Sequence, residues 1–177
     1  MGFMQRLMRL FGQPATVSGE EVDSPPEGIE RRMKERRPTA PGIKVLIIDD
    51  STTIVALLRR MMRQNEFETL EAGDAEEGIV LARTHLPQLI FLDIVLPGMN
   101  GFNALRVLRR DEGTKHIPII MISGNEQATE EFYVHRIGAD DFMKKPFARA
   151  EVFARIERLM DEDGIPRRVN VPTPEVG

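Results

Sequence analysis

Four short apolar runs of this chain each close with residues that could bind a metal ion or a phosphoryl group. These residues are two adjacent acids, a single acid, a hydroxyl followed by glycine, and a basic pair before proline, namely Asp49-Asp50, Asp93, Ser123-Gly124 and Lys144-Lys145-Pro146. If the runs are parallel strands of one sheet, their carboxyl ends lie on one rim, where such sheets bind ligands. The spacing therefore predicts one site built from all of these groups.

Carboxylates that converge on one rim need a compensating charge. Two like charges ~4 Å apart repel by roughly 4 kcal/mol at an effective dielectric near 20, so three acids either raise a pKa or bind a cation. An all-oxygen site with room for water suits Mg²⁺. A lysine could neutralise one oxygen of an incoming phosphoryl group, a serine hydroxyl could hydrogen-bond another, and a glycine would leave the approach open. One carboxylate could then accept the phosphoryl group as a nucleophile.

Each of these residues also has a simpler explanation when it is taken alone. An aspartate at a strand end is often only the N-cap of the next helix, and Asp50 or Ser51 could cap a helix that begins near Thr52. Lys145 could be an ordinary surface lysine. It is the coincidence of all these groups at strand ends of one predicted sheet that favours a chemical site.

Short apolar runs alternate with segments of helical period between residues 43 and 160. The run IKVLII at 43–48 is typical of a strand buried on both faces. We expect further strands at 67–72, 88–93, 117–122 and 140–145, and helices at about 51–64, 74–85, 101–110, 126–136 and 149–160. The alternation predicts an α/β fold with a doubly wound, five-stranded parallel sheet and helices on both faces.

Composition narrows the classes of function. The 177 residues contain no cysteine and only three histidines, which excludes thiolate catalysis and thiolate zinc sites. The net charge of −4 argues against a protein that coats nucleic acid, and no specific nucleic-acid binding is expected. No apolar stretch is long enough to span a membrane. We therefore expect a cytoplasmic protein with one folded domain.

Both flanks of the domain differ from it in composition. Residues 1–42 form an N-terminal extension, with a short amphipathic helix and then a linker rich in proline, glycine and charge. The apolar stripe of that helix in residues 2–11 could dock on a membrane or in a partner's groove, or it could pack on its own domain. A basic run at 31–37 is typical of a solvated helical linker, or it could add weak attraction to anionic lipid or nucleic acid. Residues 161–177 are predicted to be a disordered tail.

The segments VLIIDDS, FLDIVLPGMNGF, IIMISGN and GADDFMKKPF, in this order and spacing, resemble the receiver domain of bacterial two-component response regulators. The resemblance covers residues 43–160 and implies the flavodoxin-like receiver fold. It also implies phosphorylation of Asp93, which matches the family's phosphorylated aspartate, with Mg²⁺ bound beside it.

The resemblance assigns a role to each remaining site residue. Asp50 would bind the metal directly and Asp49 through water, while Asp93 and the backbone carbonyl of Val95 would complete the protein ligands. Ser123 matches the serine or threonine that moves toward the phosphoryl group, and Gly124 beside it leaves the approach open. Lys145 matches the family's lysine and Phe142 the switch aromatic. The Lys145-Pro146 peptide bond is usually cis in the family.

Two features depart from the usual pattern of the family. The switch aromatic Phe142 has no hydroxyl to bond a partner. Val95 and Asn125 stand at the two variable positions that tune dephosphorylation, and Val95 offers no polar group to orient water. A long-lived phosphoryl group is therefore expected.

The resemblance implies a sensor histidine kinase as the phosphodonor and a downstream protein target bound through residues 126–160. The chain resembles stand-alone receivers of chemotaxis and twitching motility (type IV pilus) pathways, which catalyse only their own phosphotransfer and slow autodephosphorylation. A phosphate sink or scaffold would have an identical site. A phosphohydrolase is the third alternative, although such enzymes carry D-x-D-x-[TV], whereas Ile94 and Val95 follow Asp93 here.

Overall fold

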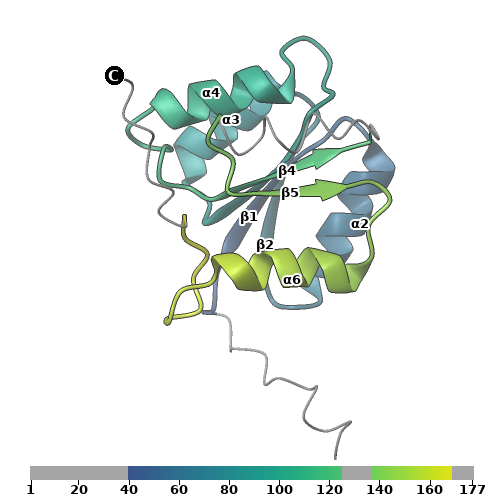
Figure 1. Cartoon of the computed structure of the whole chain (residues 1–177), viewed down its shortest axis with the longest axis vertical. Coiled ribbons are helices and arrows are strands. Elements are labelled where there is room, and N and C mark those ends of the chain that lie inside the picture. Colours follow the sequence, from purple (N-terminus) through teal and green to yellow (C-terminus); the bar gives the residue numbers. More distant parts are fainter. Residues whose placement is uncertain (1–39, 125–136, 169–177) are drawn as a thin grey trace, which may run out of the picture. The chain divides into compact units, whose positions relative to one another are not determined.

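The computed structural model describes residues 40–124 and 137–168 of the chain (Figure 1). The predicted helix at 126–136, Asn125 and the apolar stripe in residues 2–11 lie outside these ranges. Among the described residues, no helix is both long and apolar enough to cross a membrane.

Five parallel strands form a single sheet, which confirms the predicted fold class. In chain order they are β1 (Lys44–Ile48), β2 (Glu68–Ala72), β3 (Leu89–Asp93), β4 (Ile119–Ser123) and β5 (Asp141–Lys144). Their order across the sheet is β2-β1-β3-β4-β5. All residues of β3 and β4 are buried, as continuous apolar runs in a parallel sheet predict.

The described helices cover both faces of this sheet (Figure 1). One face packs on α3 (Ala75–His85) and α4 (Gly101–Arg110), and the other on α2 (Thr52–Arg63) and α6 (Arg149–Leu159). Neighbouring residues of each strand belong to opposite clusters, because side chains alternate across a strand. Leu46 and Ile48, for example, face α3 and α4, whereas Ile47 faces α2 and α6.

Side-chain caps fix where three of these helices begin. Ser51, rather than Asp50, caps α2 by accepting a hydrogen bond from Ile54 N. Asp74 caps α3 and Asn100 caps α4 in the same way. Because Ser51 takes the capping role, the neighbouring acids remain available for other chemistry.

The segment after α6 differs from its prediction as disordered tail. Residues 161–168, which we call the C-terminal arm, fold back on the domain, with Gly164 and Pro166 buried. Met160 and Pro166 form an isolated antiparallel bridge, and Arg168 forms an ion pair with Asp140. The prediction is therefore wrong for residues 161–168. Contacts with residues distant in the sequence hold this segment in place, and such contacts leave no periodic pattern in the sequence. Residues 169–177 lie outside the described ranges.

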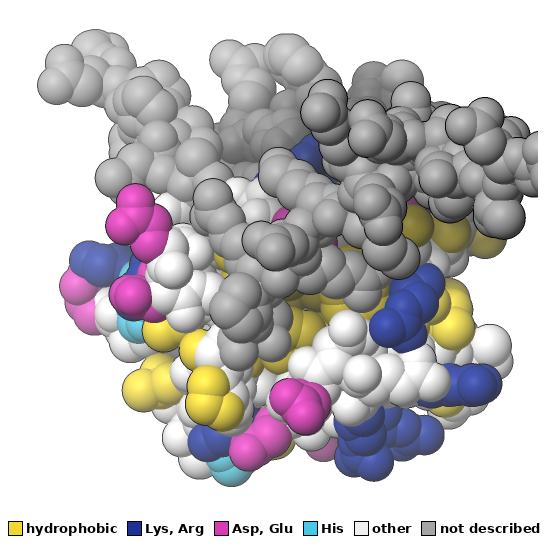
Figure 2. Space-filling view, turned by 90° about the horizontal axis from the view of Figure 1, so that it is seen from below, with side chains coloured by type: hydrophobic (Ala, Val, Ile, Leu, Met, Phe, Trp, Pro, Cys, Tyr) yellow, Lys and Arg dark blue, Asp and Glu magenta, His cyan; other side chains and the backbone are white. Residues whose placement is uncertain are grey.

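Figure 2 shows the described surface from below the view of Figure 1, the side on which α6 lies. Acidic, basic and hydrophobic side chains all occur on this face. The visible part of this face is therefore mixed in character, in keeping with the small net charge of the sequence.

Candidate functional site

The winding of the sheet reverses between β1 and β3, which are neighbours in space but not in sequence. At such a switch point the two adjoining crossover connections leave toward opposite faces, so a crevice opens beyond the carboxyl ends of the strands. Asp49 directly follows β1, and Asp93 is the last residue of β3. Carboxylate oxygens of Asp49, Asp50 and Asp93 lie within 4.8 Å of one another at this point.

Asp49 is held rigidly by its neighbours. Its backbone N–H donates to Ala72 O at 3.1 Å, and its Oδ1 accepts a hydrogen bond from Ser51 N at 2.9 Å. The residue is only 1% exposed, whereas the adjacent Asp50 is exposed. One acid of the pair is thus a fixed buried charge, and the other faces solvent.

Asp93 is buried at the end of a strand that is itself buried, with 3% of its surface exposed. Desolvation, and next the negative charge of Asp49, raise the pKa of Asp93 to about 6, although Lys145 opposes this shift. The ionised carboxylate is therefore in an unfavourable position, which a nearby positive charge would relieve.

Lys145 follows β5, and its ammonium group lies between the two buried acids. Its Nζ lies 2.7 Å from Asp49 Oδ2 and 3.3 Å from Asp93 Oδ1. Neither oxygen accepts a hydrogen bond of regular geometry. The backbone N–H of Lys145 donates to Ser123 O at 2.7 Å, and the peptide bond to Pro146 is cis.

The charges of this cluster do not balance. Three carboxylates carry three negative charges and the lysine carries one positive charge, which leaves two negative charges when all are ionised. Two buried carboxylate oxygens also lack regular hydrogen bonds. A hard divalent cation with oxygen ligands and retained water fits both observations, so the residues present fit Mg²⁺.

The remaining predicted site residues lie around this cluster. Ser123 is fully buried at the end of β4, in register with Lys144 of β5. At Gly124, an added Cβ would come no nearer than 3.9 Å to Lys145 Cδ, so the approach is open. Phe142 is 3% exposed and packs on the side of α3 and α4, whereas the Val95 side chain is exposed.

One residue that adjoins the site was not predicted from the sequence. A Cβ on Gly101, the first residue of α4, would lie 2.0 Å from the carbonyl oxygen of Asp93. The Gly101 N–H also donates to Ile94 O at 2.9 Å. The start of α4 thus rests directly on the peptide group after Asp93. The glycine in PGMNG was the only signal in the sequence.

The response regulator receiver domain family matches residues 45–157. The protein PilH of Pseudomonas aeruginosa is 38% identical over 117 residues, which cover 66% of this chain and 97% of PilH. The DNA-binding response regulator MtrA of Mycobacterium tuberculosis is 35% identical over 124 residues, 70% of this chain. The chain spans about half of MtrA, since the match covers 53% of that protein.

Solved structures show the same architecture. The chemotaxis response regulator CheY4 of Vibrio cholerae superposes with a TM-score of 0.62 at 25% identity, over 66% of this chain and 98% of that one. The receiver domain of the Francisella response regulator 1452 gives a TM-score of 0.60 at 27% identity, over 64% and 93% of the two chains.

Proposed function

Because this chain belongs to the response regulator receiver domain family, we propose that it accepts a phosphoryl group on Asp93 from a sensor histidine kinase. Asp93 is the buried acid that lies beside both Asp49 and the ammonium of Lys145. In the transfer, the bond between phosphorus and the kinase histidine nitrogen breaks, and a bond between phosphorus and an Asp93 carboxylate oxygen forms. The histidine nitrogen keeps the electron pair of the broken bond.

Each neighbouring residue has a role in this proposal. Asp50, Asp93 and the Val95 carbonyl would hold Mg²⁺, and Asp49 would act through water. When bound, Mg²⁺ neutralises charge on the phosphoryl oxygens. Lys145 offers its ammonium to one of these oxygens, and Ser123 offers its hydroxyl to another. Gly124 leaves room for them, and Phe142, which stands at the family's switch position, is already buried.

A single observation carries the proposal: three carboxylates and one lysine meet at the carboxyl ends of neighbouring parallel strands, with excess negative charge. The excess negative charge favours binding of a divalent cation. The ammonium of Lys145 favours binding of a phosphoryl group beside that cation. A structural role alone would not explain three acids within 4.8 Å of one another, because their repulsion destabilises the fold.

The experiment is phosphorylation by a small phosphodonor such as acetyl phosphate, followed by intact-mass spectrometry. The full chain should gain one phosphoryl group when Mg²⁺ is present and none in EDTA. Asp93→Asn should gain none, whereas Asp163→Asn, a change at an exposed aspartate, should behave as the unchanged chain does. Full phosphorylation of Asp93→Asn would refute the assignment.

The wider role of the chain is part of the same proposal. The likeness to PilH and CheY4 supports a messenger in type IV pilus control or chemotaxis. It would bind its target through residues 126–160, of which the structure describes 137–160. We place the protein in the cytoplasm, with residues 2–11 as a docking segment. Its catalysis is limited to its own phosphotransfer and slow autodephosphorylation.

A phosphate sink or scaffold is the alternative, and it shares every feature of the site. The two are distinguished by a pull-down with and without beryllofluoride, which mimics the phosphoryl group. A messenger should capture a target that depends on beryllofluoride, and a sink should capture only its kinase.

A further inference from the structure

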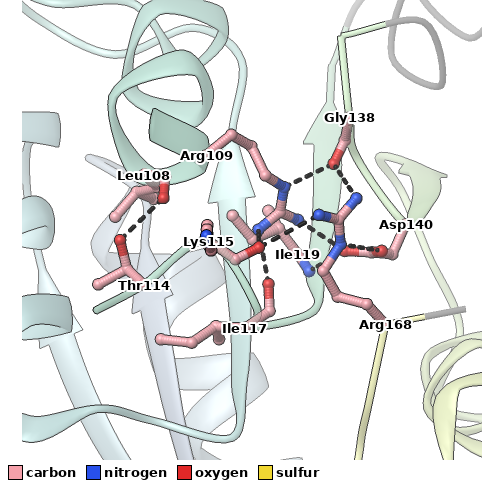
Figure 3. A network of polar contacts seen from close by, with 9 residues as sticks. All are labelled: Leu108, Arg109, Thr114, Lys115, Ile117, Ile119, Gly138, Asp140 and Arg168. Atoms are coloured by element: carbon pink, nitrogen blue, oxygen red, sulfur yellow. Dashed lines mark hydrogen bonds and ion pairs between the residues drawn. The ribbon is translucent and has the colours of Figure 1, made fainter. Parts of the chain in front are cut away.

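At the amino ends of β4 and β5, remote from the acidic site, a buried carboxylate pairs with two arginines (Figure 3). The Asp140 side chain is fully buried. Its Oδ2 accepts hydrogen bonds from Arg109 Nη2 at 2.6 Å and from Ile119 N at 2.8 Å, and its Oδ1 accepts one from Arg168 Nε at 2.9 Å. Each carboxylate oxygen therefore serves a different arginine.

The two arginines also share backbone acceptors. Arg168 donates to Lys115 O at 3.1 Å and to Gly138 O at 3.4 Å. Arg109 donates to the same two carbonyls, at 3.3 Å and 2.7 Å. Three acceptors thus converge on Arg168 in an arrangement that suits the planar fork of a guanidinium and cannot be matched by an ammonium.

The two arginines are held very differently. Arg109 belongs to α4 and is 10% exposed, so it is a fixed part of the domain. Arg168 ends the C-terminal arm, is 30% exposed, and lies beyond the residues that match the receiver family. Arg109 alone would balance the charge of Asp140. Arg168 adds a second positive charge. Burial of Arg109 is the largest cause that lowers its pKa to about 10, and the charge of Arg168 lowers it further.

The rest of the arm contributes little apolar anchorage. Only Gly164 and Pro166 of residues 161–168 are buried. The turn is organised internally by Asp161, whose Oδ1 accepts from Asp163 N and Ile165 N at 2.9 Å each. Links from the turn to the domain include Ala40 N to Gly164 O at 3.3 Å and Arg167 N to Leu159 O at 2.8 Å. The hold on the end of the arm is thus mostly polar, and salt screens partly exposed ion pairs.

From this arrangement we propose that Asp140, Gly138 and Lys115 form an arginine-binding site, and that the C-terminal arm of the same chain is its exchangeable ligand through Arg168. Arm release leaves Asp140 neutralised by Arg109, so the domain stays folded in both states. The site lies at the amino ends of β4 and β5, at the end of the sheet opposite Asp93.

The first test measures amide hydrogen exchange of the full chain by NMR, at Ile165 and Arg167 in the arm. Arg168→Ala should speed exchange at both amides on the order of tenfold or more. Arg168→Lys should not rescue it, because an ammonium loses the fork geometry. Arg167→Ala is the matched control, since its side chain bonds within the arm to Asp161, and it should have a smaller effect.

Two outcomes of this exchange experiment would overturn the proposal. Unchanged exchange in Arg168→Ala, or equal effects of both alanine variants, would mean that the turn itself holds the arm. Faster exchange throughout α4, at Leu105 and Leu108 as well, would mean that Arg168 is an integral part of the core rather than an exchangeable ligand.

The second test adds a capped peptide of residues 161–168 to the ¹⁵N-labelled Arg168→Ala chain. The amides of Ile119 and Asp140 should shift, and they should shift less in the unchanged chain, whose site is filled. The same peptide carrying Arg168→Ala should have no effect. Absence of any shift at saturating peptide would refute the site. If hydrogen-exchange protection of the arm depends on protein concentration, the arm in the site belongs to a second copy of the chain, which would contradict binding within one chain.

Discussion

At Asp93 the protein keeps a carboxylate away from water and beside another acid. The raised pKa has a consequence for stability. The unfolded carboxyl loses its proton near pH 3.8 and the folded one near pH 6, so stability falls as the pH rises through this window. Above it the penalty is complete, on the order of 2–3 kcal/mol for a pKa that rises from 3.8 to about 6.

Asp93→Asn should therefore stabilise the fold at pH 7.5 in EDTA, by up to about 2–3 kcal/mol. The gain should shrink at pH 5, where the folded carboxyl is mostly protonated, and Mg²⁺ should stabilise the unchanged chain more than the variant. Urea unfolding under these three conditions measures the effect. A variant that is less stable at pH 7.5, or a difference independent of pH, would contradict the raised pKa.

Lys145 contacts both buried acids, so its charge competes with a bound cation. Lys145→Ala should retain Mg²⁺ and bind it more tightly, while phosphorylation slows strongly because an oxygen of the phosphoryl group loses its partner. Isothermal titration calorimetry and phosphorylation rates measure the two effects. The matched control is Lys144→Ala, which alters the exposed neighbouring lysine. Loss of Mg²⁺ binding in Lys145→Ala would show that the lysine is needed for the metal site.

At the scale of the elements, α4 begins in direct contact with the peptide group after Asp93. Gly101→Ala would push a Cβ against the Asp93 carbonyl, so α4 or the peptide after Asp93 must shift, at a cost on the order of 1–3 kcal/mol. Mg²⁺ affinity and phosphorylation rate should both fall in the folded variant. Gly73→Ala is the control, since nothing lies within 4 Å of its added Cβ. A folded Gly101→Ala protein with unchanged rates would argue against this contact as a determinant of the site.

The strands and most helices could be predicted from the sequence because their signals are local. Continuous β-branched runs and helical periods recur in the right order, and the acids, serine and lysine stand at strand ends. The contact of Gly101 with Asp93 could not be predicted, because it depends on how closely α4 approaches β3. The pairing of Arg168 with Asp140 joins residues 28 positions apart. Prolines and missing periodicity in the last 17 residues instead suggested a disordered tail throughout.

At the scale of the whole molecule, all proposed site residues lie in the described part of residues 40–168. We expect the N-terminal extension, residues 1–42, to set location rather than chemistry, since every proposed site residue follows residue 48. Deletion of residues 1–39 should leave the phosphorylation rate unchanged within about twofold, because none of these residues belongs to the proposed site. Fluorescent fusions of the full and truncated chains would report location in cells, and identical distributions would refute the docking role of residues 2–11.

The most direct test of the account locates the phosphoryl group chemically in the full chain. Borohydride reduces an aspartyl phosphate to homoserine, which peptide mass spectrometry can assign to one position. After treatment with acetyl phosphate and Mg²⁺, homoserine should appear at residue 93 and nowhere else, and it should be absent when EDTA replaces Mg²⁺. Homoserine at Asp49 or Asp50, or a phosphoryl group retained on Ser123, would contradict the assignment of Asp93 as the phosphoacceptor.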